Sequence, residues 1–160
     1  MDWLGTLFLF LHIGGVIVAF GPTIAFPFIA GRAAKEPMHG NFALRASEFI
    51  TERVVEPGAV FVFLTGVGLI FTRGLNPLVH LWVAVAIVLF LITLGYANLV
   101  QLPTVKKMVA ITSQPPPASA AAPAGPPPGF TELSARAARG GQFMTLMLFT
   151  ILALMVVKPF

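Results

Sequence analysis

The sequence of 160 residues has no cysteine, a single tyrosine and few charges, with ten Lys or Arg and six Asp or Glu. The missing cysteines exclude disulfides, thiolate metal centres and cysteine nucleophiles, so a metal would need histidine, methionine, carboxylate or backbone ligands. Soluble domains carry about 25% charged residues. This chain is 10% charged and 57% hydrophobic, which predicts an integral membrane protein.

The formal net charge of +4 would raise the question of nucleic acid on a soluble protein. Here the cations lie at the ends of apolar runs, and no basic cluster alternates with aromatic residues. Membrane topology therefore explains the positive charge better than nucleic-acid binding does. We expect the partners to be the lipid bilayer and other membrane protein subunits or further copies of this chain, with no nucleic acid.

Long uncharged runs set the predicted architecture. The first extends from Trp3 to Gly31 and exceeds the ~20 residues that a helix needs to cross a bilayer. Comparable runs predict spans at about residues 3–29, 54–72, 78–102 and 142–157. We therefore predict an all-α fold, a four-span antiparallel (up-down-up-down) helix bundle, with residues 1–160 forming a single transmembrane domain.

Two segments between the spans have a different character. Residues 42–56 predict an amphipathic helix with Glu48, Glu52 and Glu56 on one face, lying at the membrane surface or extending a span into water. Residues 113–129, SQPPPASAAAPAGPPPG, are rich in proline and alanine. Such a composition supports neither a helix nor a core, so we expect a flexible loop.

The cations predict the orientation. Eight of the ten lie in the two large connecting segments, namely Arg32, Lys35, Arg45, Arg53, Lys106, Lys107, Arg136 and Arg139. The positive-inside rule places these segments in the cytoplasm and both termini outside. We expect the protein to reside in the bacterial cytoplasmic (inner) membrane.

A histidine interrupts the first apolar run. Residues spaced by three and four form one stripe of the predicted helix: Gly5, Phe8, His12, Gly15, Ala19 and Pro22. Small residues allow another helix or a flat cofactor to approach closely, so we expect His12 to face the bundle. Pro22 and Pro27 should bend or loosen the second half of this span.

His12 and His80 are the histidines within predicted spans, and both fall in the outer half of the membrane. A neutral imidazole can ligate haem iron or copper, which makes the two residues candidate ligands of haem b. In a straight bundle the two would lie at depths that differ by roughly 9 Å. The alternative is that His12 hydrogen-bonds a neighbouring helix and that His80 reaches the membrane interface.

Other side chains offer weaker chemistry. Met144 and Met147 could bind Cu(I), although methionines more often fill gaps in packing. Glu56 is the deepest carboxylate of the 42–56 face, and a proton or metal role is an alternative to a solvated face. The chain has no glycine-rich phosphate loop, nucleophile elbow or metalloprotease motif, and we name no catalytic residue.

Three segments carry a resemblance to a known family: FLFLHIGGVIVAFGPTIAFPFIAGRA, LTGVGLIF and HLWVAVAIVLFLITLGY. Together they resemble a family of small predicted bacterial integral membrane proteins of unknown function, which is distantly similar to the four-helix CopD-type (copper resistance) and HemJ-type (protoporphyrinogen oxidase) membrane proteins. The resemblance to HemJ-type proteins implies a haem-associated histidine at His12. Those proteins also use a lysine in the membrane, and residues 78–102 contain none.

Three functions follow from these observations. The first is a membrane protein without a catalytic set that serves as an accessory subunit of a larger complex. The second is a haem-binding membrane redox protein that uses His12 and His80. The third is a copper or small-solute permease.

Overall fold

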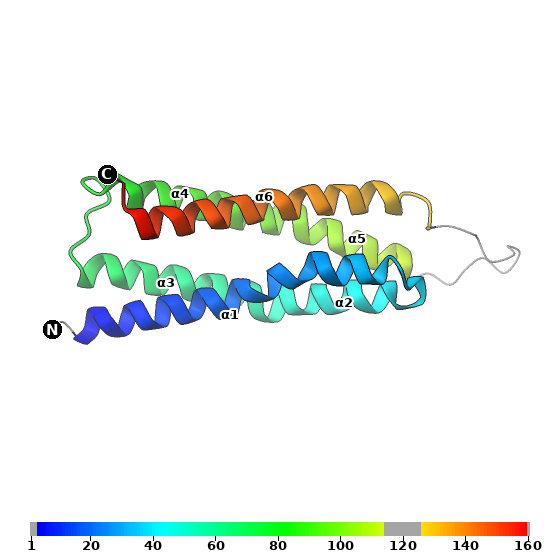
Figure 1. Cartoon of the computed structure of the whole chain (residues 1–160), viewed down its shortest axis with the longest axis horizontal. Coiled ribbons are helices and arrows are strands. Elements are labelled where there is room, and N and C mark those ends of the chain that lie inside the picture. The colour runs from blue at the N-terminus through cyan, green and yellow to red at the C-terminus, as the bar shows by residue number, and fades with distance from the viewer. Residues whose placement is uncertain (1–2, 114–125, 160) are drawn as a thin grey trace, which may run out of the picture.

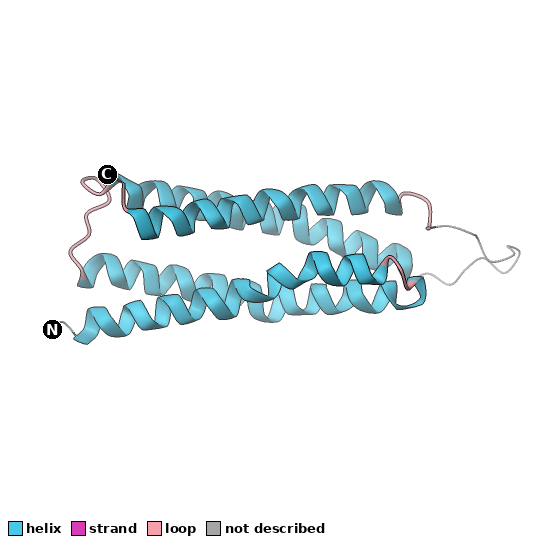
Figure 2. Cartoon of the chain, in the orientation of Figure 1, coloured by secondary structure: helices cyan, strands magenta, loops and turns pink. Residues whose placement is uncertain are grey.

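The computed structural model describes residues 3–113 and 126–159, and all regular secondary structure in these ranges is helical (Figure 2). Four helices are long and apolar enough to cross a membrane: Trp3–Ala33, Gly40–Thr72, Leu81–Thr112 and Phe130–Val157. The predicted all-α membrane fold is therefore confirmed for the described ranges.

The four helices lie side by side as long rods, and the N- and C-termini are at the same end (Figure 1). The helical segments, in chain order, are α1 (Trp3–Ala33), a 3-10 turn (Pro37–His39), α2 (Gly40–Ile50), a π turn (Thr51–Val55), α3 (Glu56–Thr72), α4 (Leu81–Tyr96), a second π turn (Ala97–Gln101), α5 (Leu102–Thr112) and α6 (Phe130–Val157). The segments α2 and α3 form the second rod, and α4 and α5 form the third.

The rods are longer than the predicted spans. The second rod has 33 residues, which corresponds to about 50 Å and exceeds the ~30 Å of a bilayer core. The predicted amphipathic segment 42–56 lies inside this rod and leads into α3 without a break. Most of the predicted proline-rich loop, residues 114–125, lies outside the described residues.

Each of the two middle rods contains a π turn that ends two residues before a proline. The residue before each proline donates its N–H to the carbonyl five positions back, Glu56 to Thr51 and Leu102 to Ala97. Proline has no N–H, and its ring clashes with the carbonyl four residues earlier in a regular helix. The wider π turn relieves that clash, so Pro57 and Pro103 are accommodated without ending the rods.

Prolines in the first rod have a milder effect. Pro22 and Pro27 both lie inside α1, which continues as helix to Ala33. Figure 1 shows that α1 changes direction partway along its length. The predicted bend is thus present, and the helix does not end there.

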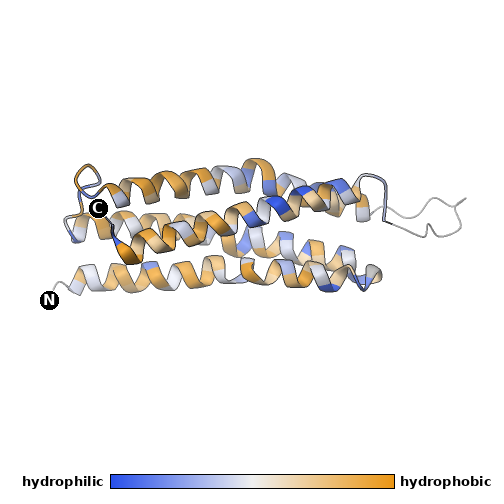
Figure 3. Ribbon diagram, turned by 45° about the horizontal axis from the view of Figure 1, so that its top comes forward, coloured by the Kyte–Doolittle hydropathy of each residue, from blue (hydrophilic) through white to orange (hydrophobic). Residues whose placement is uncertain are grey.

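Polar contacts join the rods at the end opposite the termini, where Figure 3 shows more hydrophilic residues. The amide nitrogen of Asn41, at the start of α2, donates to Thr112 Oγ1 at 2.8 Å and to Ser113 Oγ at 3.0 Å, at the end of α5. Farther along, Lys106 Nζ lies 2.7 Å from Glu52 Oε1. The two basic connecting segments therefore adjoin the same end of the bundle.

Candidate functional site

The candidate site lies in the seam between α1 and α3, the most extensively packed pair of helices. Ala19 is 0% exposed and lies directly against Gly58, where an added Cβ would come within 2.6 Å of the Ala19 Cβ. An added Cβ on Gly15 would meet the Phe61 ring at 2.8 Å. The prediction that the stripe containing His12 faces a neighbouring helix is confirmed, and that neighbour is α3.

His12 crosses this seam and bonds to α3. Its Nδ1 lies 3.0 Å from the carbonyl oxygen of Val62 and 3.2 Å from Thr65 Oγ1. A carbonyl oxygen only accepts hydrogen bonds, so the contact with Val62 requires the proton to be on Nδ1. In the neutral form of the imidazole this tautomer has its lone pair on Nε2.

Two small residues of α3 shape the wall against which the ring lies. Thr65 is 4% exposed, and its hydroxyl donates within α3, to the carbonyl of Phe61 at 2.9 Å or of Val62 at 3.0 Å, so its oxygen lone pair is available to Nδ1. Gly66 faces the ring, because an added Cβ there would lie 3.2 Å from His12 Cε1. The imidazole is held by its Nδ1 edge and by contact with the backbone of α3.

The atom of this site that could bind a ligand is His12 Nε2. No described residue forms a hydrogen bond with this nitrogen. A half-buried neutral imidazole with a free nitrogen can ligate a metal or accept a hydrogen bond from a ligand. Across residues 3–113 and 126–159 no group of three or more His, Asp or Glu side chains could hold a metal.

His80 lies elsewhere in the bundle. It precedes Leu81, the first residue of α4, and its Nδ1 lies 3.2 Å from the carbonyl oxygen of Asn76. His12 is level with Thr65, about 10 Å inside the end of α3 at Thr72. Since α1 packs mainly on α3 and α4 mainly on α6, the two histidines are on different helix pairs and no described contact joins them.

A second seam, between the third rod and α6, contains polar residues for which no role was predicted. Gln101 Nε2 donates to the Ala137 carbonyl at 3.1 Å, and the Tyr96 ring lies 4.9 Å from the Phe143 ring. Gly140 is buried beneath Tyr96 and Gln101. Polar residues within a long uncharged run, Tyr96 and Gln101, were the available signal, but the partner helix could not be inferred from them.

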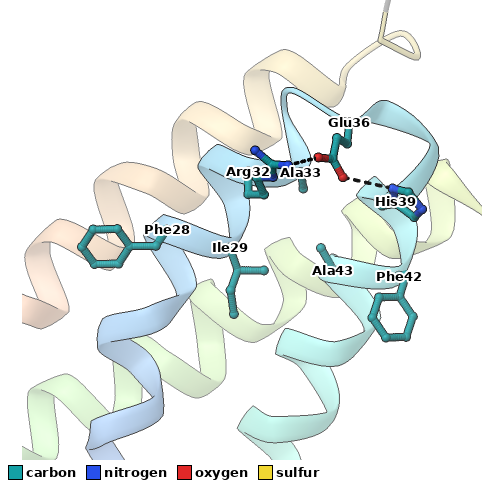
Figure 4. Close-up of a pocket in the computed structure, with 8 residues that line it drawn as sticks. All are labelled: Phe28, Ile29, Arg32, Ala33, Glu36, His39, Phe42 and Ala43. Carbon is teal, nitrogen blue, oxygen red and sulfur yellow. Dashed lines mark ion pairs between the residues drawn. The ribbon is translucent and has the colours of Figure 1, made fainter.

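A shallow pocket of about 360 Å³ lies near the turn between α1 and α2 (Figure 4). Glu36 forms an ion pair with Arg32, and its second oxygen lies 3.3 Å from His39 Nδ1. These groups are exposed at the polar end of the rods, where they help the chain to reverse direction. The mutual pairing of the charged groups leaves this pocket a weaker candidate than the seam at His12.

Comparison with known proteins gives one family. No curated protein and no solved structure matches the chain. The match to the family model covers residues 6–159 and thus extends beyond the three segments that carried the resemblance. The similarity to CopD-type and HemJ-type proteins remains a prediction. With nearly its whole length matched, the chain belongs to the family described as "Predicted integral membrane protein (DUF2269)".

Proposed function

We propose that this integral membrane protein binds haem b through Nε2 of His12. The hydrogen bond from His12 Nδ1 to the Val62 carbonyl, at 3.0 Å, carries the proposal. Metal-ligating histidines almost always donate their other ring N–H to a carbonyl, carboxylate or water, which fixes the tautomer and the ring orientation. An ionisable residue within a membrane span is uncommon and often functional.

The residues around His12 fit a haem ligand in two respects. The neutral imidazole offers its nitrogen lone pair without first losing a proton, and Gly66 lets the ring lie close against α3. A bound haem would supply one-electron oxidation and reduction. The chain itself would hold the imidazole in one tautomer, through Val62 and Thr65, among apolar neighbours.

His80 is the candidate for a second ligand. Its Nδ1 also contacts a backbone carbonyl, that of Asn76, which leaves Nε2 available. Because His80 lies near the end of the bundle, we propose that His12 determines whether haem is bound. His80 would then affect the spectrum of the bound haem more than its amount.

The proposal is tested by purifying the protein in mild detergent from cells supplied with a haem precursor. The oxidised and reduced absorption spectra and the iron and copper contents are measured. We expect a Soret band and stoichiometric iron, both lost in His12→Ala. His39→Ala is the matched control, because His39 lies in the turn between α1 and α2 and should leave the spectrum unchanged.

Two results would contradict the proposal. One is a colourless wild-type protein with neither iron nor copper. The other is equal haem content in the wild type and His12→Ala. Stoichiometric copper without a Soret band would favour the alternative of a copper permease.

A role as an accessory subunit is the second candidate, and the exposure of α6 favours it. In an apolar stretch of 18 residues within α6, 6% of the stretch is buried in the bundle. The share is 17% for the corresponding stretch of each of the other three rods. Lipid or another membrane helix would cover such a face. Co-purification of a membrane partner in stoichiometric amount would support the role if Leu146→Asn, a change on this face, abolished it. Purification of the wild type without a partner would oppose the role.

We propose that the protein resides in the bacterial cytoplasmic membrane. Both termini would lie outside, and the basic connecting segments would lie in the cytoplasm. The contacts of Asn41 with Thr112 and of Glu52 with Lys106 support one shared side for these segments. A topology reporter fused after Phe160 should be active only in the periplasm. Activity in the cytoplasm would overturn the assignment.

A further inference from the structure

A lateral groove of about 550 Å³ opens between the second and third rods beside both π turns. Its polar lining comes from Glu52, Arg53, Glu56 and Asn98, and its apolar lining from Pro57, Val60 and Leu94. The groove therefore has one charged part and one hydrocarbon part. It is separate from the seam that holds His12, and the inference does not depend on the proposed function.

The charges in the groove are not paired with each other. Glu52, at its polar end, is joined to Lys106 at 2.7 Å, and this ion pair bridges the two rods. Neither Arg53 nor Glu56 forms an ion pair with any described residue. One cation and one carboxylate are thus left to interact with a ligand that carries both signs of charge.

Asn98 adds a neutral acceptor to the polar lining. Its amide nitrogen donates to the Leu94 carbonyl at 3.0 Å, which leaves the side-chain oxygen without a described partner. The Glu56 carboxylate and the Asn98 oxygen both accept hydrogen bonds, whereas Arg53 donates them. The two acceptors are complementary to an ammonium group with several N–H donors, and the Arg53 donor is complementary to an adjacent anionic phosphate.

The apolar part continues towards the centre of the bundle. Beyond Val60 and Leu94, the Phe63 and Phe90 rings lie 6.0 Å apart and connect the same two rods. Pro57 to Thr72 is uncharged, and its 16 residues span about 24 Å. Glu56 therefore lies at the boundary between the hydrocarbon core and the headgroup region, where a phospholipid has its own change from polar to apolar.

We propose that this groove binds a phospholipid whose headgroup carries a primary ammonium, as in phosphatidylethanolamine. Glu56 and Asn98 would accept hydrogen bonds from the ammonium, Arg53 would bind the phosphate, and an acyl chain would follow Val60 and Leu94. Choline lipids carry a quaternary ammonium without N–H donors, and glycerol lipids have no cation. The groove should therefore select the ethanolamine headgroup over both.

Native mass spectrometry of the detergent-solubilised full chain tests the proposal. The protein is incubated with equimolar ethanolamine, choline and glycerol phospholipids that carry identical acyl chains. We expect preferential retention of the ethanolamine lipid. In Glu56→Gln this preference should fall about tenfold, the effect of one charge-assisted hydrogen bond. Glu48→Gln, which changes a carboxylate outside the groove, should keep it.

Asn98→Leu provides a second variant at an exposed position and should also weaken the preference. Circular dichroism and gel filtration identify variants that fold like the wild type. Equal retention of ethanolamine and choline lipids by the wild type would overturn the proposal. So would an equal loss in Glu48→Gln and Glu56→Gln, or stronger binding of the glycerol lipid.

Discussion

The imidazole of His12 and the carbonyl of Val62 are joined across the α1–α3 seam by a hydrogen bond of 3.0 Å. The carbonyl belongs to the backbone of a helix, so substitution of the Val62 side chain leaves this acceptor in place. The bond fixes the imidazole tautomer and leaves Nε2 free, which links the packing of the bundle to the proposed chemistry.

Thr65→Val should lower stability by about 1 kcal/mol, because it removes the second acceptor of His12 Nδ1 while keeping the shape of the side chain. The bond to Val62 remains, so we expect haem content to stay close to that of the wild type. Stability is measured by thermal unfolding in detergent. Thr93→Val is the matched control, because Thr93 is also buried and its hydroxyl donates only to the Leu89 carbonyl. A larger loss in Thr93→Val would argue against an interaction between Thr65 and His12.

Gly58→Ala should destabilise the protein by about 1–3 kcal/mol, since its new methyl group would force α1 and α3 apart at Ala19. Gly95→Ala is the control, because nothing lies within 4 Å of the Cβ that it would add. It should leave stability unchanged or raise it by about 0.5–1 kcal/mol. Thermal unfolding of both variants measures the difference, and equal stabilities would contradict the packing described for the seam.

The contact between the start of α2 and the end of α5 is tested by cross-linking, which the absence of cysteine makes straightforward. The double substitution Asn41→Cys and Thr112→Cys should react with a short bifunctional thiol reagent, because the two native side chains are hydrogen-bonded at 2.8 Å. Asn41→Cys with Arg73→Cys should not react, because these positions lie at opposite ends of the second rod. Gel mobility reports the internal cross-link. If the variant with Asn41→Cys and Thr112→Cys formed no cross-link, the two basic segments would lie apart.

The sequence was sufficient to predict a membrane bundle and the helix face on which His12 lies. Spacings of three and four place residues on one side of a helix whatever surrounds it. The partners of His12 could not be predicted in the same way. They depend on the alignment of α1 with α3, which is set by close contacts such as that of Ala19 with Gly58.

Helix ends and π turns were also beyond the sequence analysis. A change in hydropathy marks the edge of the lipid, whereas a helix continues into water when its polar side chains find partners, as Glu52 and Lys106 do in their ion pair. A proline such as Pro57 would kink a regular helix, and the structure accommodates it with a π turn. The π turn that precedes Pro103 contains Asn98, which lines the lateral groove, and this groove depends on the packing of the two rods.

The absorption spectrum of His12→Gly, recorded with and without added imidazole, tests the central claim most directly. If Nε2 of His12 ligates the haem, the variant purified without imidazole should lack a Soret band, and imidazole should restore haem binding by replacing the missing ligand. Gly14→Ala, a change on the same helix with nothing within 4 Å of its added Cβ, should bind haem without imidazole. Haem binding by His12→Gly that is undiminished and insensitive to imidazole would contradict the account.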